Sequence, residues 1–177
     1  MVYVPLQSRG VIVLYGPDTR DFQQGIITND INKLDSQKAI YSLLLSPQGK
    51  NLYDFFLIAY DKYILLECEN GARDMVQNSS FPLQYLIDKV NGISFDKGCY
   101  IDQEVVNRMN RQETFRRKLY LVEGNNVLSN ISTKVANENN EEIGELRSSI
   151  DNIGIALLCA GKSYVNLYTS EVKIFTR

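Results

Sequence analysis

Apolar and polar positions alternate in short runs over the first third of the chain, a pattern typical of β-strands joined by turns. Residues 10–15 form a continuous apolar run, which predicts a buried strand. Pro17 and Asp18 follow and predict a short helix, because proline suits the first helical position and an acidic side chain complements the positive helix end. Phe22 and Ile26 lie one helical turn apart and give that helix a narrow apolar face.

Three further apolar runs lie at residues 39–45, 52–60 and 63–68. They are separated by the polar breaks 46–50 and 61–62, which have the composition of tight turns. Runs of this length joined by turns predict a three-stranded antiparallel meander.

The middle of the chain changes to helical spacing of apolar residues, which predicts short helical segments at 72–76, 83–90 and 103–110. Beyond residue 116 the pattern returns to short strands divided by glycine, asparagine and aspartate, at 119–122, 131–135, 143–147, 153–158, 164–168 and 172–175. Short strands at this spacing predict a small β-barrel. The fold class is therefore expected to be α+β, with an N-terminal antiparallel sheet and short helices followed by a C-terminal β-barrel.

Composition and charge narrow the class of protein. The chain has 177 residues, of which 44% are hydrophobic and 23% charged, values that suit one globular domain or two small ones. The net charge of −2 gives no general attraction for polyanions, so a direct nucleic-acid partner is not expected. We expect neither a membrane span nor a signal peptide, because the required apolar and basic runs are missing from the sequence.

Histidine is absent, which excludes a Ser-His-Asp triad, a Cys-His dyad and any zinc site that needs histidine. Cys68, Cys99 and Cys159 are odd in number and far apart, so they predict neither a disulfide framework nor a closed four-thiolate metal site. We therefore expect a reducing, cytoplasmic location and no resident metal.

Cys99 is the candidate reactive residue. Lys97 precedes it closely, and a helix is predicted just after it with Asp102 as its cap, so two positive influences favour a thiolate and a pKa below about 8.5. Gly98 would allow a close backbone approach or a positive φ, and Tyr100 offers a flat face and a hydroxyl. The alternative is that Cys99 is a small buried apolar residue at a junction between loop and helix.

A basic stretch and two acids complete the candidates. Guanidinium groups in the stretch could form an anion pocket, although a solvated helix face and the polar side of a strand are the favoured explanation. The residues are Arg108, Arg111, Arg116, Arg117 and Lys118. The turn at 46–50 lacks the spacing of a phosphate-binding loop. Asp30 and Asp54 are isolated acids, and nothing in the sequence pairs them.

The segment 91–105, NGISFDKGCYIDQEV, closely resembles the signature of the YgfZ family, whose core is Lys-Gly-Cys-Tyr/Phe-x-Gly-Gln-Glu. Residues 9–30 and 45–54 resemble the family's first strand–helix unit and hairpin, and Ile143-Gly144 with the run 156–158 resembles its C-terminal barrel. These proteins share the fold of the glycine-cleavage T-protein.

The resemblance implies a folate-binding domain over residues 1–112 and a β-barrel domain over 113–177. It implies tetrahydrofolate binding and a supporting role in assembly or repair of iron–sulfur clusters, including those of tRNA-modifying enzymes. The motif positions imply Cys99 as the functional cysteine and a folate site at Lys97, Gly98, Cys99, Tyr100, Gln103 and Glu104. We add Arg108 to this expected site from the basic stretch. The partners implied are folate and iron–sulfur proteins or their assembly machinery.

Two departures from the family stand out. Asp102 replaces the motif glycine. If the backbone needs a positive φ at this position, aspartate tolerates it at some cost, and its carboxylate adds a negative charge near Cys99. The long segment that relatives carry after the strand near Cys68 is replaced by residues 71–80, and apolar surface uncovered by that loss would favour a homodimer.

Two other functions remain open. A folate-dependent aminomethyl or one-carbon transferase of T-protein type is one, although Asp54 is then the single acid where that enzyme has a pair. A module that only binds other proteins is the other.

Overall fold

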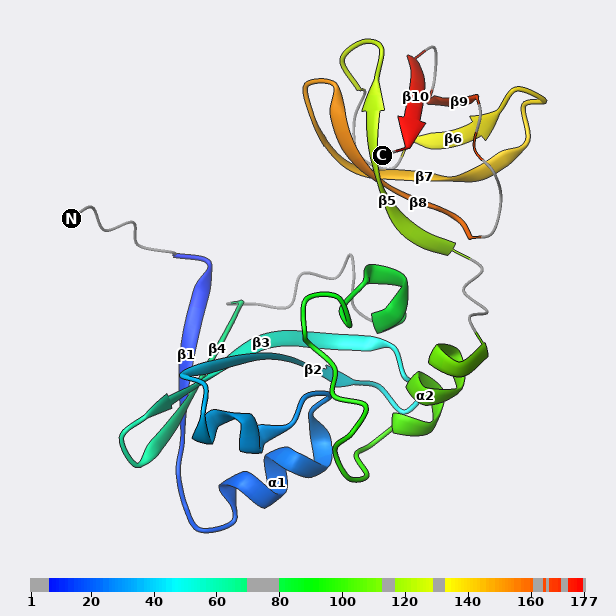
Figure 1. Cartoon of the computed structure of the whole chain (residues 1–177). Helices are drawn as coiled ribbons and strands as arrows, with labels where there is room; N and C mark the ends of the chain where they lie inside the picture. Colours follow the sequence, from blue (N-terminus) through cyan, green and yellow to red (C-terminus); the bar gives the residue numbers. More distant parts are fainter. Residues whose placement is uncertain are drawn as a thin grey trace. The chain divides into compact units, whose positions relative to one another are not determined.

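The computed structural model describes residues 7–69, 80–112, 117–128, 133–160, 164, 166–169 and 172–176. The chain divides into two compact units, Met1–Gln112 and Glu113–Arg177, which are described separately (Figure 1). In the described residues no helix is long and apolar enough to cross a membrane.

The N-terminal unit is built on a four-stranded antiparallel sheet in the order β1-β4-β3-β2. Its strands are β1 (Arg9–Leu14), β2 (Ala39–Leu45), β3 (Asn51–Tyr60) and β4 (Tyr63–Glu69). The predicted meander is confirmed as β2-β3-β4, and β1 joins it through backbone hydrogen bonds to β4.

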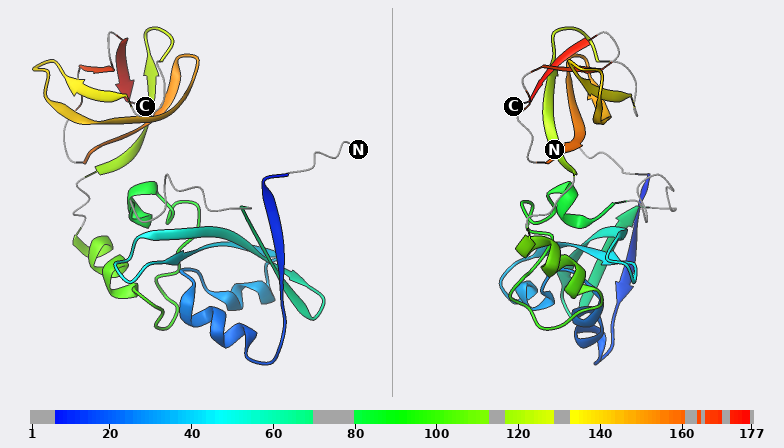
Figure 2. Two further views of the ribbon diagram at one scale, coloured as in Figure 1. Left: turned by 180° about the vertical axis from the view of Figure 1, so that it is seen from behind. Right: turned by 90° about the vertical axis from the view of Figure 1, so that its right-hand side faces the viewer.

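One face of this sheet carries the core of the unit. Helix α1 (Thr19–Ile26) and the 3₁₀ helix η1 (Ile31–Asp35) cover that face (Figure 2). Ile31 and Leu34 from η1 pack there with residues from the strands, including Leu57 and Ile64. Burial of these side chains is the main stabilising contribution, at about 25 cal/mol for each Å² of apolar surface removed from water.

The prediction that residues 10–15 form a buried strand is wrong about burial. β1 is an edge strand, and Val11, Ile12 and Val13 are 59%, 53% and 50% exposed. α1 begins at Thr19, after Asp18 rather than at Pro17, and the apolar face predicted for it is incomplete because Phe22 is 63% exposed. An apolar run shows that a strand forms, but its neighbours decide how much of it is covered.

The second half of this unit contains η2 (Pro82–Tyr85) and helix α2 (Gln103–Gln112). The helix predicted at 103–110 is confirmed, whereas the segment predicted at 83–90 is helical only over η2. The helix predicted at 72–76 lies outside the described residues. The turn between β2 and β3 packs on α2: Gly49 has φ +74°, and a Cβ there would lie 2.8 Å from Val105 Cγ1.

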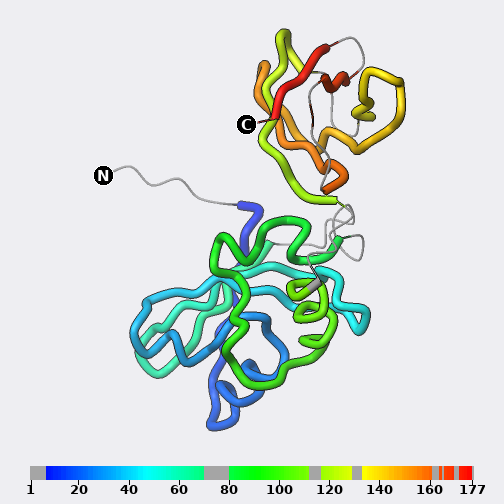
Figure 3. The backbone as a smooth tube through the Cα atoms, turned by 45° about the vertical axis from the view of Figure 1, so that its right-hand side comes forward, coloured from blue at the N-terminus to red at the C-terminus, as the bar shows by residue number. Residues whose placement is uncertain are grey.

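The C-terminal unit is a closed six-stranded barrel, traced as a tube in Figure 3, with the strand order β10-β5-β8-β7-β6-β9. The strands are β5 (Arg117–Gly124), β6 (Lys134–Asn137), β7 (Glu142–Ile150), β8 (Ile153–Cys159), β9 (Leu167–Thr169) and β10 (Val172–Thr176). Val122, Leu146, Leu158 and Ile174 fill its interior. The predicted α+β fold with a C-terminal β-barrel is confirmed.

Candidate functional site

The segment 94–101 is attached to α1 and the residues that follow it by backbone hydrogen bonds. Ser94 N donates to Thr28 O at 2.9 Å, and Ile101 N donates to Gly25 O at 3.0 Å. Thr28 Oγ1 also donates to Gly92 O at 2.6 Å. These bonds hold the segment in place directly before α2.

Lys97 is the most firmly held polar residue of this segment. Its side chain is buried, and Nζ donates to the backbone carbonyls of Gln24, Ile27 and Asn29 at 2.6, 2.8 and 2.9 Å. An ammonium group has three N–H donors, so all of them are used. Burial lowers the pKa of Lys97 to about 8, a shift that the negative charge of Asp30 opposes.

The three carbonyls lie at and just beyond the C-terminal end of α1, where carbonyl oxygens lack partners within the helix. A cation at this end of a helix also interacts favourably with its dipole. Lys97 therefore joins the motif segment to α1, and its Nζ has no donor left for Cys99 or for a ligand.

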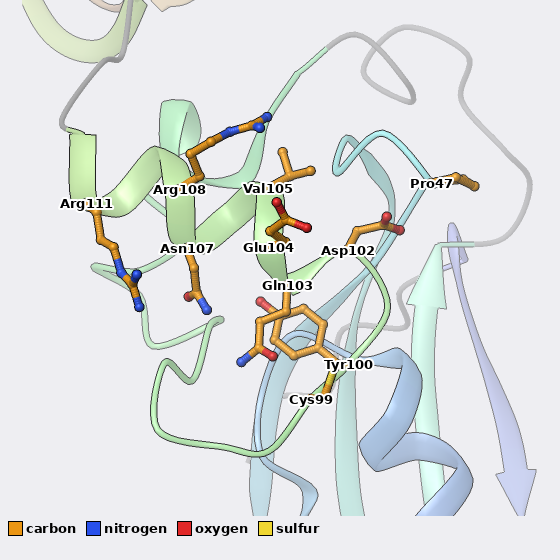
Figure 4. A pocket seen from close by; sticks show the side chains of 10 residues that line it. All are labelled: Pro47, Cys99, Tyr100, Asp102, Gln103, Glu104, Val105, Asn107, Arg108 and Arg111. Atoms are coloured by element: carbon orange, nitrogen blue, oxygen red, sulfur yellow. The ribbon is translucent and has the colours of Figure 1, made fainter.

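The rest of the motif lines a pocket with a volume of about 890 Å³, shown in Figure 4. The pocket takes its walls from the tip of the β2–β3 turn, from the residues before α2 and from α2 itself. The lining residues are Pro47, Cys99, Tyr100, Asp102, Gln103, Glu104, Val105, Asn107, Arg108 and Arg111.

Five of the predicted site residues line this pocket together: Cys99, Tyr100, Gln103, Glu104 and Arg108. Lys97 and Gly98 are not among its lining residues. Gly98 is exposed and has neither a positive φ nor any atom close enough to exclude a side chain, so the positive φ predicted as one of its two roles is wrong. The close approach of its backbone to a ligand stays a prediction.

Asp102, four positions after Gly98, does have a positive φ, at +66°. Asp102 stands directly before α2, where the family motif has glycine, and aspartate is among the few residues that tolerate this conformation. The expectation that the glycine position needs a positive φ is therefore met by an aspartate.

Polar side chains form two rows along α2. Gln103, Asn107 and Arg111 recur every fourth residue, so they lie on one side of the helix, and Figure 4 shows Asn107 and Arg111 pointing the same way. Glu104 and Arg108 form the second row by the same spacing. Sequence reasoning missed Asn107 and did not assign Arg111 to the site, although their spacing from Gln103 was a sufficient signal.

Two buried polar atoms on the pocket lining have no hydrogen-bond partner among the described residues: Tyr100 Oη and Asp102 Oδ2. Tyr100 is only 4% exposed, and burial raises the pKa of its hydroxyl to about 12. Burial also raises the pKa of the Asp102 carboxyl. A buried polar group without a partner costs about 1–3 kcal/mol.

The other candidates lie apart from the pocket lining. Cys68 and Cys159 are half-buried in β4 and β8, in contrast to Cys99, which is exposed and lines the pocket. Of the basic stretch, Arg117 and Lys118 lie on β5 of the barrel unit, and Arg116 is outside the described residues. In the described part of the chain, no group of three or more acidic or cysteine side chains could hold a metal ion.

Comparisons with known proteins place this geometry in context. Residues 116–160 match the family described as "CAF17, C-terminal beta-barrel domain". The chain is 32% identical over 124 residues to the human mitochondrial iron-sulfur cluster assembly factor IBA57. This match covers 67% of the chain and 34% of the human protein. It is 38% identical over 65 residues to the tRNA-modifying protein YgfZ of Vibrio vulnificus strain YJ016, covering 37% of this chain and 20% of that protein.

A solved structure agrees with this fold. The glycine cleavage system aminomethyltransferase T from Bartonella henselae superposes with a TM-score of 0.79 over 97% of this chain and 83% of that chain, at 7% identity. The chain belongs to the YgfZ/IBA57 family of the T-protein fold. It spans about a third of the length of the IBA57 proteins of human and mouse that it matches. Within this YgfZ/IBA57 chain, the motif that carried the resemblance is the segment that anchors α1 and lines the pocket.

Proposed function

We propose that this YgfZ/IBA57 protein binds tetrahydrofolate in the α2 pocket and acts as an accessory factor in assembly or repair of iron–sulfur clusters, including those of tRNA-modifying enzymes. The observation that carries the proposal is the pocket itself, where the motif residues Cys99, Tyr100, Gln103 and Glu104 line one open volume. The matches to an iron-sulfur cluster assembly factor and to a tRNA-modifying protein support the choice of process.

The pocket chemistry suits a folate. Arg108 and Arg111 can each hold a carboxylate through paired N–H groups, which suits the glutamate end of the ligand. Gln103 and Asn107 carry side-chain amides that both donate and accept, as the edge of a fused heterocycle requires. Val105 supplies apolar contact beside them.

Calorimetric titration with 5-formyltetrahydrofolate tests the binding. We expect saturable binding and a higher Tm at saturating ligand, because a ligand that binds only the folded state stabilises it. Replacing both arginines in Arg108→Gln/Arg111→Gln should weaken binding about tenfold or more. Arg20→Gln is the matched control, since Arg20 pairs with Asp35 at the protein surface away from the pocket lining. Absence of binding at millimolar ligand would exclude this function.

Cys99 is proposed as the functional cysteine because it is exposed at the pocket. In a Cys68→Ala/Cys159→Ala background, the rate of alkylation reports Cys99 alone. We expect bound folate to slow this rate severalfold, because the ligand would cover the sulfur. If Cys99 also reacts no faster at neutral pH than a model thiol, the predicted activated thiolate is excluded.

The second candidate function is an aminomethyl or one-carbon transferase. It is favoured by 37% identity over 59 residues to the aminomethyltransferase of Desulforamulus reducens, covering 32% of this chain and 16% of that protein. Asp54 is the single acid of this chain at the place where that enzyme has a pair. It is exposed on β3 and accepts a hydrogen bond from Tyr41 Oη at 3.3 Å. Turnover of an aminomethyl donor with tetrahydrofolate, lost in Asp54→Asn, would support this function over the accessory one.

A homodimer is part of the proposal, and the sheet surface opposite α1 supports it. In the antiparallel register Val11, Glu67 and Phe56 lie side by side, as do Val13, Leu65 and Ile58, so these side chains share one face. Val11, Val13 and Phe56 are 59%, 50% and 43% exposed on it.

Sedimentation velocity tests the dimer. Val13→Lys/Phe56→Lys should shift the protein toward monomer, whereas Val90→Lys, at a residue 58% exposed outside the sheet, should not. A wild-type protein that is monomeric at 100-fold the concentration used for folate titration would exclude the dimer while leaving the folate proposal intact.

A reducing compartment is proposed from the wide spacing of the cysteines, and the relatives include mitochondrial as well as bacterial proteins.

A further inference from the structure

Asp102 combines two unfavourable features. Its backbone has φ +66°, a left-handed conformation that glycine adopts at lower cost than a residue with a side chain. One of its carboxylate oxygens, Oδ2, is buried without a hydrogen-bond partner among the described residues. Both costs would vanish if the residue were the glycine of the family motif.

Asp102 shares the lining of the pocket with a second residue, Tyr100, that also carries a buried oxygen without a partner among the described residues. Tyr100, two positions earlier, is almost fully buried, and its hydroxyl also lacks a partner. Both residues line the same pocket (Figure 4). The carboxylate of Asp102 can only accept hydrogen bonds, so a ligand group that bonds to it must carry an N–H donor.

We propose that Asp102 is a specificity-determining residue of this pocket, whose carboxylate accepts a hydrogen bond from a ring N–H or amino group of the bound folate. The proposal rests on the folate function above and adds a contact that a glycine at this position cannot make. The side chain as a whole is half-buried, so rotation about its side-chain bonds can present either oxygen to the pocket.

The opposite effects of one substitution on folding and on binding identify such a residue. Asp102→Gly removes the backbone cost and the buried oxygen, so it should raise the Tm. The same change should weaken binding of 5-formyltetrahydrofolate about tenfold or more, because a charge-assisted hydrogen bond is lost. Strain that favours function over stability has this signature.

The chain offers a matched control. Asp61, in the turn between β3 and β4, also has a positive φ, at +53°, and is not among the pocket-lining residues. Asp61→Gly should therefore raise the Tm in the same way and leave folate affinity unchanged. Asp102→Asn keeps the shape and tolerates the backbone but loses the charge, and it should bind at an intermediate affinity.

A ligand change tests the contact directly. An analogue of 5-formyltetrahydrofolate in which methyl replaces the ring amino group should bind the wild type more weakly than the parent compound. In Asp102→Gly the two compounds should bind alike. If wild-type protein binds the parent compound and Asp102→Gly binds it equally well or better, the inference is overturned while the folate function stands. If the wild type binds no folate at all, the proposed function fails first.

Discussion

Within the motif segment 97–104, the buried polar groups differ in whether they have hydrogen-bond partners. At Lys97 every donor of a buried ammonium is matched by a backbone carbonyl of the α1 region. At Tyr100 and Asp102 buried oxygens remain without partners on the lining of a pocket. One continuous motif therefore has a structural end and a ligand-facing end, and a match to the motif does not by itself show which residue does what.

The sharpest way to test the structural end is Lys97→Met. The substitution leaves three buried carbonyls without their donor, so we expect a loss of about 3 kcal/mol in the free energy of unfolding. Urea denaturation followed by circular dichroism measures this change. Lys62→Met is the control, because Lys62 is exposed over the Tyr63 ring at 5.3 Å and should change stability by less than about 0.5 kcal/mol. Equal effects of the two substitutions would contradict the anchoring role.

Gly49 and Gly98 differ in whether the backbone position requires a glycine. Gly49→Ala places a Cβ 2.8 Å from Val105 Cγ1 at φ +74°, so it should cost about 2 kcal/mol. Gly98→Ala meets open space without a positive φ and should cost less than about 0.5 kcal/mol. Thermal unfolding of both variants makes the comparison. Adding Val105→Ala should recover only the steric part of the Gly49→Ala loss.

Tyr100→Phe probes the ligand-facing end. Removing a hydroxyl that is buried without a partner should leave the free energy of unfolding unchanged or raise it by up to about 1 kcal/mol. The same variant should bind 5-formyltetrahydrofolate with unchanged affinity, because the buried hydroxyl has no surface open to a ligand. Calorimetry and urea denaturation on one preparation give both values, and a clear loss of stability would show that the hydroxyl has a partner within the fold.

The smallest expected effect is the pH dependence of Asp102. Burial raises the pKa of its carboxyl in the folded state, so the folded protein holds this proton to a higher pH than the unfolded chain does. The charged carboxylate therefore destabilises the fold above the folded pKa, and the penalty disappears as pH falls below the unfolded pKa of about 3.9. Asp102→Asn should be more stable than wild type at pH 7 by less than about 1 kcal/mol, and the difference should shrink toward pH 4. A difference that grows as pH falls would contradict the direction of the shift.

Local patterns in the sequence were enough to predict most elements. The meander followed from apolar runs broken at 46–50 and 61–62, and the barrel followed from short strands between glycine and asparagine turns. Strand alternation and turn chemistry depend on neighbouring residues, so they can be recognised without the fold. The row Gln103, Asn107 and Arg111 could have been recognised in the same way.

Tertiary structure alone decided what each of these residues contacts. The carbonyl partners of Lys97 lie about seventy positions away, so its apparent closeness to Cys99 in the sequence did not predict its bonds. The exposure of β1 depended on its place at the sheet edge, which no local pattern records. Chain neighbours fix periodicity and backbone preference, whereas burial, hydrogen-bond partners and pKa depend on segments that only folding brings together. The sequence identified the motif segment, and the folded chain divided it between an anchor at Lys97 and a pocket lining at Tyr100 and Asp102.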